Sequence, residues 1–231
     1  MLRRIFGGHN ELEWTLIPKV YPKERKEHHS GKILLPLLCL EVLLNKQVEM
    51  PYIFKISAHG GISYTHTGVH EFTDDIQDTV LPQWMYDQLA LDSSPVEVSC
   101  TTLPKGTFIR LLPQSKDFLE LEDPKRCLED ALRNYQVLST GDTISLYFEE
   151  EFKQILFTVS EIRPNGEGIS IIDTDLEVDF LPPVDYEAEV PAEEPNLLVQ
   201  TEGGVHLADP YFNHAEGLGV VFLPSPGTVQ P

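Results

Sequence analysis

The sequence predicts a β-rich α+β protein, in which a pseudo-twofold β barrel precedes a small unit of one helix and several strands. Two observations indicate this arrangement. The first hundred residues contain two similar strand–helix–strand segments, and the residues after Pro113 contain one amphipathic helix and several strands instead of a third copy. The chain has 231 residues, 41% of them hydrophobic, which is enough to bury one large or two small cores.

The two similar segments are residues 33–44 and 79–90, which align on Pro36 and Pro82. Each has apolar residues, then Leu-Pro, then a short amphipathic helix. In both copies another proline opens the next expected strand, in which apolar and polar residues partly alternate. Chance similarity of two short helices is the alternative to a true repeat. The matching prolines on both sides favour the repeat, and with it the barrel.

A helix is expected after Asp123, which is a good N-cap and precedes Pro124 at the first helical position. Leu128, Leu132 and Tyr135 follow at helical spacing and predict one buried stripe. We expect Trp84, in the second copy of the repeat, and its neighbour Met85 to be core residues on a helix face.

Several strands follow this helix, in the stretches "TGDTISLYF", "KQILFTVSEIRP" and "GISIIDTDLEVDF". Turns are expected at Gly141-Asp142 and at Pro164-Asn165-Gly166. We therefore interpret Pro113-Gln114-Ser115 as the junction between a barrel subdomain, residues 10–112, and an α+β subdomain, residues 113–183.

The net charge of −20 argues against nucleic acid or an anionic membrane surface as the main partner, because both attract basic proteins. A basic protein surface is the natural complement. Three scattered cysteines, Cys39, Cys100 and Cys127, are typical of reduced, packed thiols. We see no secretory signal, and the longest apolar stretch is too short to span a bilayer. We expect a soluble protein without direct membrane insertion.

The last segment, residues 184–231, has eight acidic residues, six prolines and neither Lys nor Arg. Such a composition buries too little apolar surface to offset the entropy of ordering. We expect a mostly disordered acidic tail.

Between residues 31 and 182, motifs in a fixed order and spacing resemble the N-terminal domain of the ubiquitin fusion degradation protein 1 family. The block from Pro113 to Asp142 is the most specific part. The residues that carry the resemblance are Gly31-Lys32-Ile33, Leu35-Pro36, Phe54-Lys55, Thr65-His66, Gly68-Val69, Glu71-Phe72, Leu81-Pro82, Trp84-Met85, Pro113-Gln114-Ser115, Asp117-Phe118-Leu119, Pro124-Lys125, Leu128-Glu129, Ala131-Leu132-Arg133-Asn134, Thr140-Gly141-Asp142, Ser170-Ile171-Ile172-Asp173 and Val178-Asp179-Phe180.

The resemblance implies a double-psi β barrel followed by an α+β roll, similar to the N-terminal domain of the valosin-containing AAA ATPase. It implies a non-catalytic adaptor that binds ubiquitin and polyubiquitin and pairs with the nuclear protein localisation 4 homologue. Such an adaptor delivers ubiquitylated clients to the ATPase for degradation, including degradation associated with the endoplasmic reticulum. The expected location is the cytoplasm and nucleus, peripherally at that membrane. Neither the resemblance nor the residues identify the ubiquitin contacts.

Enzyme readings have little support in the sequence. His66 and His70 have a metal-like spacing, but on a strand they lie on the order of 13 Å apart, too far for one ion. The sequence lacks a Gly-x-Ser-x-Gly motif, a phosphate-cradling loop and the aspartic-protease signature. We expect no catalytic residues, no metal and no cofactor.

The tail departs from the family pattern. Family members carry short motifs of the form Phe-x-Gly-x-Gly-x-x-Leu that bind the ATPase. Here Gly217, Gly219 and Phe222 are candidates for such a motif, but Phe212 lies too far before the first glycine. Two glycines among apolar residues can also be an ordinary loop. The alternative function is therefore a stand-alone ubiquitin-binding or scaffold module that is not attached to the ATPase complex.

Overall fold

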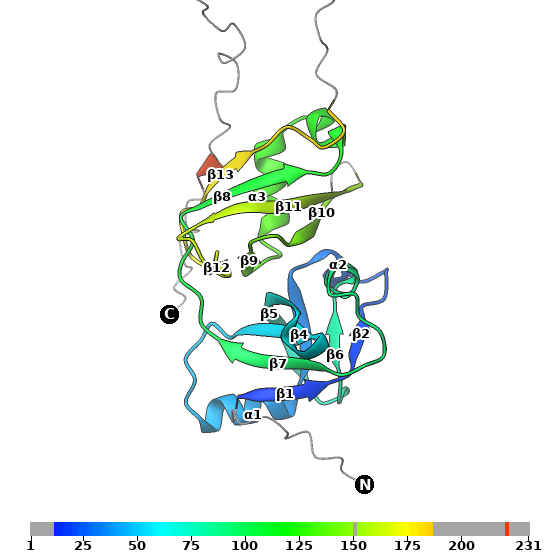
Figure 1. Cartoon of the computed structure of the whole chain (residues 1–231), viewed down its shortest axis with the longest axis vertical. Coiled ribbons are helices and arrows are strands. Elements are labelled where there is room, and N and C mark those ends of the chain that lie inside the picture. The colour runs from blue at the N-terminus through cyan, green and yellow to red at the C-terminus, as the bar shows by residue number, and fades with distance from the viewer. Residues whose placement is uncertain (1–11, 150–151, 187–219, 222–231) are drawn as a thin grey trace, which may run out of the picture.

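The computed structural model describes residues 12–149, 152–186 and 220–221, which form two lobes stacked along the long axis (Figure 1). The lower lobe is a seven-stranded sheet with two helices. Its elements are β1 (Glu13–Leu16), β2 (Pro18–Val20), β3 (Lys32–Pro36), α1 (Leu37–Asn45), β4 (Ile53–Ala58), β5 (Ser63–Thr73), β6 (Thr79–Leu81), α2 (Gln83–Gln88) and β7 (Val96–Thr101), with 3-10 turns η1 (Lys26–His29) and η2 (His59–Gly61).

The strand order of the lower sheet is β1-β7-β4-β5-β3-β6-β2. Its two outer strands, β1 and β2, follow each other along the chain with only Ile17 between them. The sheet therefore curls back on itself and forms a barrel. Trp14, Ile33, Leu35, Phe54 and Ile56 are buried in its core.

The strand register reflects the internal repeat of the sequence, because equivalent residues of the two copies pair with each other. Leu34 of β3 pairs with Val80 of β6, which is its own counterpart when Pro36 is aligned with Pro82. Lys55 of β4 and Ser99 of β7, which correspond when the two strand-opening prolines are aligned, also pair with each other. Pairing of equivalent residues is what a local twofold axis produces.

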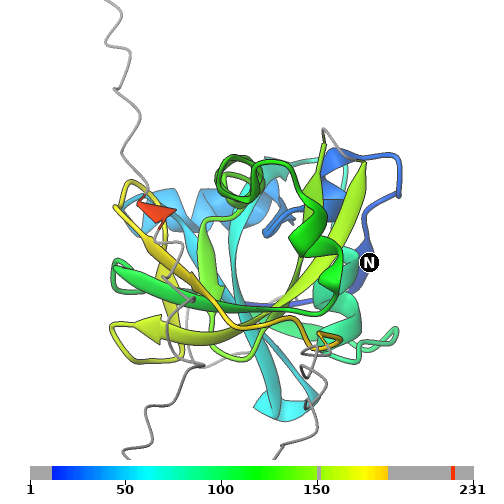
Figure 2. The same ribbon diagram turned by 90° about the horizontal axis from the view of Figure 1, so that it is seen from above.

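The upper lobe is built on a five-stranded sheet of order β10-β11-β8-β13-β14, with a two-stranded sheet, β9 and β12, beside it. Figures 1 and 2 both show β14 beside β13 at the outer edge. The elements are β8 (Phe108–Pro113), η3 (Lys116–Glu120), α3 (Pro124–Leu132), β9 (Val137–Ser139), β10 (Thr143–Phe148), β11 (Lys153–Arg163), β12 (Gly168–Ser170), β13 (Glu177–Phe180) and β14 (Val220–Val221).

The chain passes from the lower sheet to the upper sheet earlier than the sequence suggested. Residues 108–112, expected to belong to the barrel subdomain, lie in β8, which pairs with β11 and β13 of the upper sheet. Pro113 itself is still paired, with Phe157. Alternation along a strand shows that it is half-buried but not which sheet it joins, so the turn after Pro113 was mistaken for the lobe junction.

The predicted helix is confirmed as α3. The Asp123 side chain accepts a hydrogen bond from the Arg126 N–H at 3.1 Å, and Leu128, Leu132 and Tyr135 are buried. Trp84 and Met85, on α2, are buried as expected. Within the part of the chain that the structure describes, each helix is too short or too polar to cross a membrane.

Candidate binding surfaces

The seam between the lobes is held by a buried carboxylate. Asp142 follows Gly141 in the turn before β10 and is 3% exposed. It accepts hydrogen bonds from the hydroxyl of Thr65 on β5 and from Nε2 of Gln88 on α2, the second at 2.5 Å. Burial, the largest influence, raises its pKa to about 6, although the hydrogen bonds oppose the shift. Asp142 thus links the two lobes by hydrogen bonds, and its burial makes it inaccessible to a substrate.

His66 lies in the same seam. Its Nδ1 is 3.0 Å from the Ser139 hydroxyl, and its Nε2 is 3.9 Å from a Glu167 carboxylate oxygen. Burial, followed by the charge of Lys55, lowers the pKa of His66 to about 4, so this imidazole is neutral at neutral pH.

The two histidines with metal-like spacing have separate partners. His70 is exposed and pairs with Glu27 at 3.2 Å, whereas His66 faces the seam. Among residues 12–149, 152–186 and 220–221, no group of three or more His, Cys, Asp and Glu could hold a metal ion.

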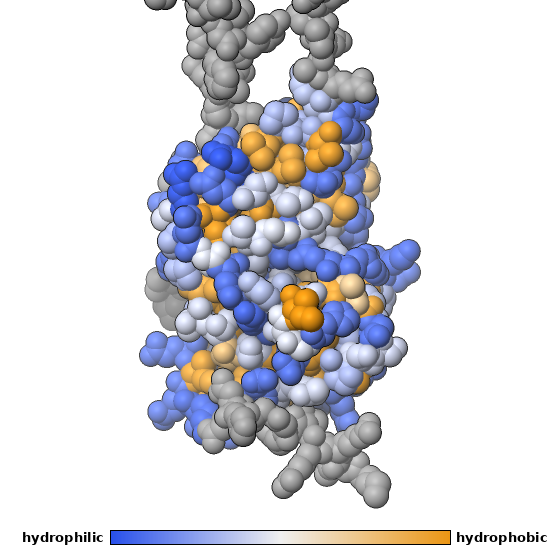
Figure 3. All heavy atoms as spheres, in the orientation of Figure 1, coloured by the Kyte–Doolittle hydropathy of each residue, from blue (hydrophilic) through white to orange (hydrophobic). Residues whose placement is uncertain are grey.

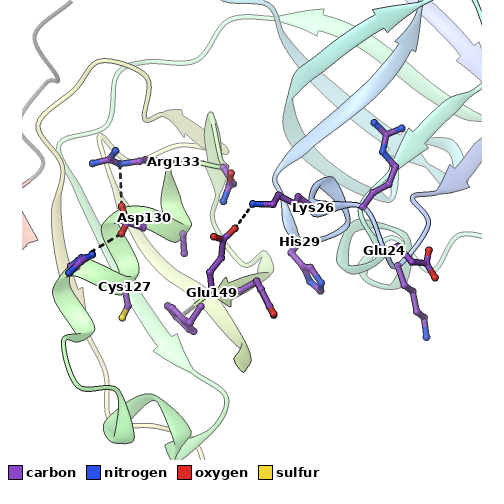
Figure 4. A pocket seen from close by; sticks show the side chains of 14 residues that line it. Glu24, Lys26, His29, Cys127, Asp130, Arg133 and Glu149 are labelled. Carbon is purple, nitrogen blue, oxygen red and sulfur yellow. Dashed lines mark hydrogen bonds and ion pairs between the residues drawn. The ribbon is translucent and has the colours of Figure 1, made fainter. Parts of the chain in front are cut away.

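A cleft of about 590 Å³ opens where the two lobes meet (Figure 4). Its walls come from the chain around η1 in the barrel and from α3 and β10 in the upper lobe. An ion pair of 3.0 Å between Lys26 and Glu149 bridges the two walls. His29 stacks on Tyr147 with 4.8 Å between ring centroids, and burial followed by the nearby His28 lowers the pKa of His29.

The cleft contains a thiol and an imidazole, Cys127 and His29. Figure 4 shows them on opposite walls with Glu149 between them, which is not the arrangement of a nucleophile and its base. Asp130 in the cleft lies 4.0 Å from Arg126 and 3.7 Å from Arg133. The cleft therefore presents charged and aromatic side chains.

A second kind of surface lies at the far end of the upper lobe. Phe118 of η3 packs on Phe180 at the end of β13, with ring centroids 4.9 Å apart. The residues next to this aromatic pair point outward and are apolar, and Figure 3 shows apolar colouring gathered at this end. We call the exposed apolar residues the outer surface; they are Leu119, Leu181, Val184 and Tyr186.

Carboxylates predominate among the charged residues beside the outer surface. Asp117, Glu120, Glu122, Asp123 and Asp185 are exposed in the same two segments as its apolar residues, together with Lys116, and Glu120 pairs with Lys153 at 2.6 Å. The Leu181 N–H donates to the Leu111 carbonyl at 2.9 Å, and the Val184 N–H to the Pro113 carbonyl at 3.1 Å. These bonds keep the chain after β13 alongside the end of β8, next to η3. The sequence alone does not reveal this surface, because its two halves are some sixty residues apart.

The barrel has its own exposed apolar region, around α1. Leu37 and Leu38 begin this helix, and Leu44 and Met50 lie at and after its end, with Met50 78% exposed. We call these four residues the α1 surface. The candidate tail residues Gly217, Gly219 and Phe222 lie outside the described residues.

Comparison with known proteins shows the family to which this two-lobed, β-rich chain belongs. Residues 10–104 match the family described as "Ubiquitin fusion degradation protein UFD1, N-terminal subdomain 1", and residues 105–183 match its "N-terminal subdomain 2". The division between these matches falls just before β8, where the sheets change partner. The chain belongs to the ubiquitin fusion degradation protein 1 family.

Three relatives illustrate the similarity. The chain is 38% identical over 160 residues to ubiquitin fusion degradation protein 1 of Saccharomyces cerevisiae, covering 68% of this chain and 44% of that protein. It is 34% identical over 200 residues to ubiquitin recognition factor in ER-associated degradation protein 1 of Homo sapiens (86% and 62%). It is 36% identical over 160 residues to the Caenorhabditis elegans homolog of ubiquitin fusion degradation protein 1 (69% and 46%). The chain thus spans about half the length of these relatives.

Proposed function

We propose that the chain is a non-catalytic adaptor module that binds ubiquitin and polyubiquitin through the outer surface. The observation that carries this proposal is the composition of that surface, with four exposed apolar side chains among five exposed carboxylates. Ubiquitin's usual contact face is apolar with a basic rim, so both its apolar centre and its charges find complements here. Family membership supports the same function, as does a relative named for ubiquitin recognition.

The proposal includes the finer architecture. Two strand pairs in the lower sheet are parallel, β3 with β5 and β2 with β6. In both copies the strand before the helix, β3 or β6, thus has a parallel neighbour, which supports a double-psi barrel followed by an α+β roll, as in the N-terminal domain of the valosin-containing AAA ATPase.

The proposal also includes the partners. The module acts in the cytoplasm and nucleus, with the nuclear protein localisation 4 homologue, and delivers ubiquitylated clients to the valosin-containing AAA ATPase. The tail around Gly217, Gly219 and Phe222 supplies the ATPase contact. Deleting residues 210–231 then weakens ATPase capture and leaves ubiquitin binding intact, and loss of both would overturn this division of labour.

Titration of labelled ubiquitin and tetra-ubiquitin into the chain tests the ubiquitin contact. Changing Leu119, Val184 and Tyr186 together to Ala should weaken binding about tenfold or more, because each loses buried apolar contact. The matched control is Leu44→Ala with Met50→Ala on the α1 surface, which should bind as the parent does. Tetra-ubiquitin should bind more tightly than ubiquitin through multivalency.

The outcomes separate the parts of the proposal. If the parent chain binds neither ligand up to millimolar concentration, ubiquitin recognition is wrong. If the parent binds and only the α1-surface variant loses affinity, recognition stands but the contact lies on the barrel. Weaker binding at raised salt supports the role of the carboxylates.

A further inference from the structure

The edge of the upper sheet carries a strand from far along the chain. On one side β13 pairs in parallel with β8, from Glu177 opposite Phe108 to Phe180 opposite Leu111. On its other side β13 pairs antiparallel with β14, with Glu177 opposite Val221 and Val178 opposite Val220. Without β14, this side of β13 would be the edge of the sheet (Figure 2).

The direction of the backbone bonds along β13 can be assigned. The Glu177 N–H donates to the Thr107 carbonyl at 3.0 Å, which lies on the β8 side. Because successive N–H groups along a strand point in opposite directions, the Val178 N–H points toward β14. Val178 and Val220 are then the hydrogen-bonded pair of this antiparallel ladder, and Glu177 and Val221 are the non-hydrogen-bonded pair.

We propose that the open edge of β13 is a strand-binding site and that its occupant is the chain's own segment around Val220–Val221. An unpaired sheet edge presents N–H and C=O groups that accept an added strand. The segment suits this role, because residues 219–223 read Gly-Val-Val-Phe-Leu, which is apolar, uncharged and free of proline. Valine is favoured in strands because its β-branched side chain packs on the pleated surface.

Covalent attachment favours this occupant over a free strand. Residues 187–219 join the end of the upper lobe to β14, so docking is an intramolecular event. The effective concentration of such a tethered segment is on the order of millimolar, and its closure cost grows only slowly with length. A short ladder that would be weak between separate molecules is therefore populated within one chain.

The segment around Val220–Val221 cannot pair with β13 and be bound by another protein at the same time. Gly217, Gly219 and Phe222 lie on either side of β14 in the sequence, so an ATPase that bound them would compete with β13. This consequence, unlike the docking itself, rests on the proposed ATPase contact.

Disulfide trapping tests the register. In the full chain, Glu177→Cys with Val221→Cys should form an intrachain disulfide under mild oxidation, identified by mass spectrometry of the linked peptides. The matched control is Glu177→Cys with Gln200→Cys. Position 200 is closer to 177 along the chain, so an undocked tail would cross-link it more readily. Equal or faster trapping of the control pair would overturn the proposal, and so would trapping only between two copies.

Amide exchange tests the hydrogen bond. Val220→Pro removes the N–H that faces β13 and should speed exchange of the Val178 amide about tenfold. Val221→Pro is the control, because its N–H faces away from β13, and it should change the Val178 rate much less. If neither variant alters the Val178 rate, β13 has no strand bound at this edge and the proposal fails.

Discussion

The two lobes differ in how they treat the edges of their sheets. In the barrel, β1 and β2 are joined through a single residue, Ile17, so the seven strands close on themselves. In the upper lobe the sheet is open, with β10 at one side and β13 with the short β14 at the other. A closed sheet can bind partners through its side chains, whereas an open sheet can also bind them through the backbone N–H and C=O groups of its edge strands.

This difference assigns different kinds of recognition to the lobes. The barrel can bind through exposed side chains such as those of the α1 surface. The upper lobe adds a strand edge and an apolar face with several exposed carboxylates beside it. Three experiments test how far the two lobes depend on each other.

Leu132→Ala asks whether the lobes unfold as one. Leu132 is 2% exposed and lies on α3, so its truncation should cost about 2–5 kcal/mol of unfolding free energy. Both tryptophans, Trp14 and Trp84, belong to the barrel, so their fluorescence reports on the other lobe. We expect the tryptophan transition in urea to move with the mutation, because the seam couples the lobes. The lobes unfold independently if the tryptophan transition is unchanged while far-UV circular dichroism shows a transition at lower urea concentration than in the parent.

Gly31→Ala tests the seam directly. A methyl group at Gly31 would overlap the ring of Tyr135, which is buried and fixed by a 2.6 Å hydrogen bond from its hydroxyl to the Ser145 carbonyl. Such overpacking should cost about 1–3 kcal/mol, measured by urea denaturation. Gly166→Ala is the control, because open space surrounds that position, and its effect should stay within about 0.5 kcal/mol. Equal effects of the two changes would contradict a tight seam.

The third experiment uses pH. The folded protein holds the Asp142 proton more tightly than the unfolded chain, so between the ordinary pKa of 3.8 and about 6 this residue makes stability fall as pH rises. His66 acts in the opposite sense, because its folded pKa of about 4 is below the ordinary 6.5, and stability rises with pH across that window. The two contributions therefore offset each other between about pH 4 and 6.

Substituting either residue should leave the pH dependence that the other one contributes to the unfolding free energy. Asp142→Asn should make unfolding free energy rise with pH more steeply than in the parent, by about 1.4 kcal/mol per pH unit between pH 4 and 6. His66→Gln should shift the slope by a similar amount in the opposite direction. Urea denaturation of the three proteins at several pH values measures both slopes. Identical slopes in all three would show that neither group titrates abnormally.

The sequence predicted those elements whose signals are local. The cap at Asp123, the proline after it and the spacing of Leu128 and Leu132 were enough to define α3. The repeat was visible because two prolines mark equivalent positions in both copies. Most of β8 was assigned to the barrel subdomain, whereas it pairs in the upper sheet, because tertiary packing decides which strands a segment joins.

The contacts between the lobes and the two halves of the outer surface join residues that are far apart in the sequence. Asp142 was recognised as part of a turn, but its partner Thr65 is 77 residues away, and one sequence does not reveal such a pairing. The outer surface combines η3 with the residues after β13 for the same reason. The composition of the tail suggested disorder and gave no sign that Val220 would lie opposite Val178.

The close packing at the seam has a geometric consequence. Gly31 lies against Tyr135 and Gly68 against Gln136, so at both places backbone from the barrel touches a side chain of the upper lobe without a side chain of its own between them. These two close contacts oppose hinge motion of the lobes, although a cleft opens elsewhere along the seam. They favour one separation between the outer surface and the α1 surface. A partner made of linked modules can bind both surfaces at once only if its linkers match this separation. A partner with linkers of another length binds only one of the two surfaces.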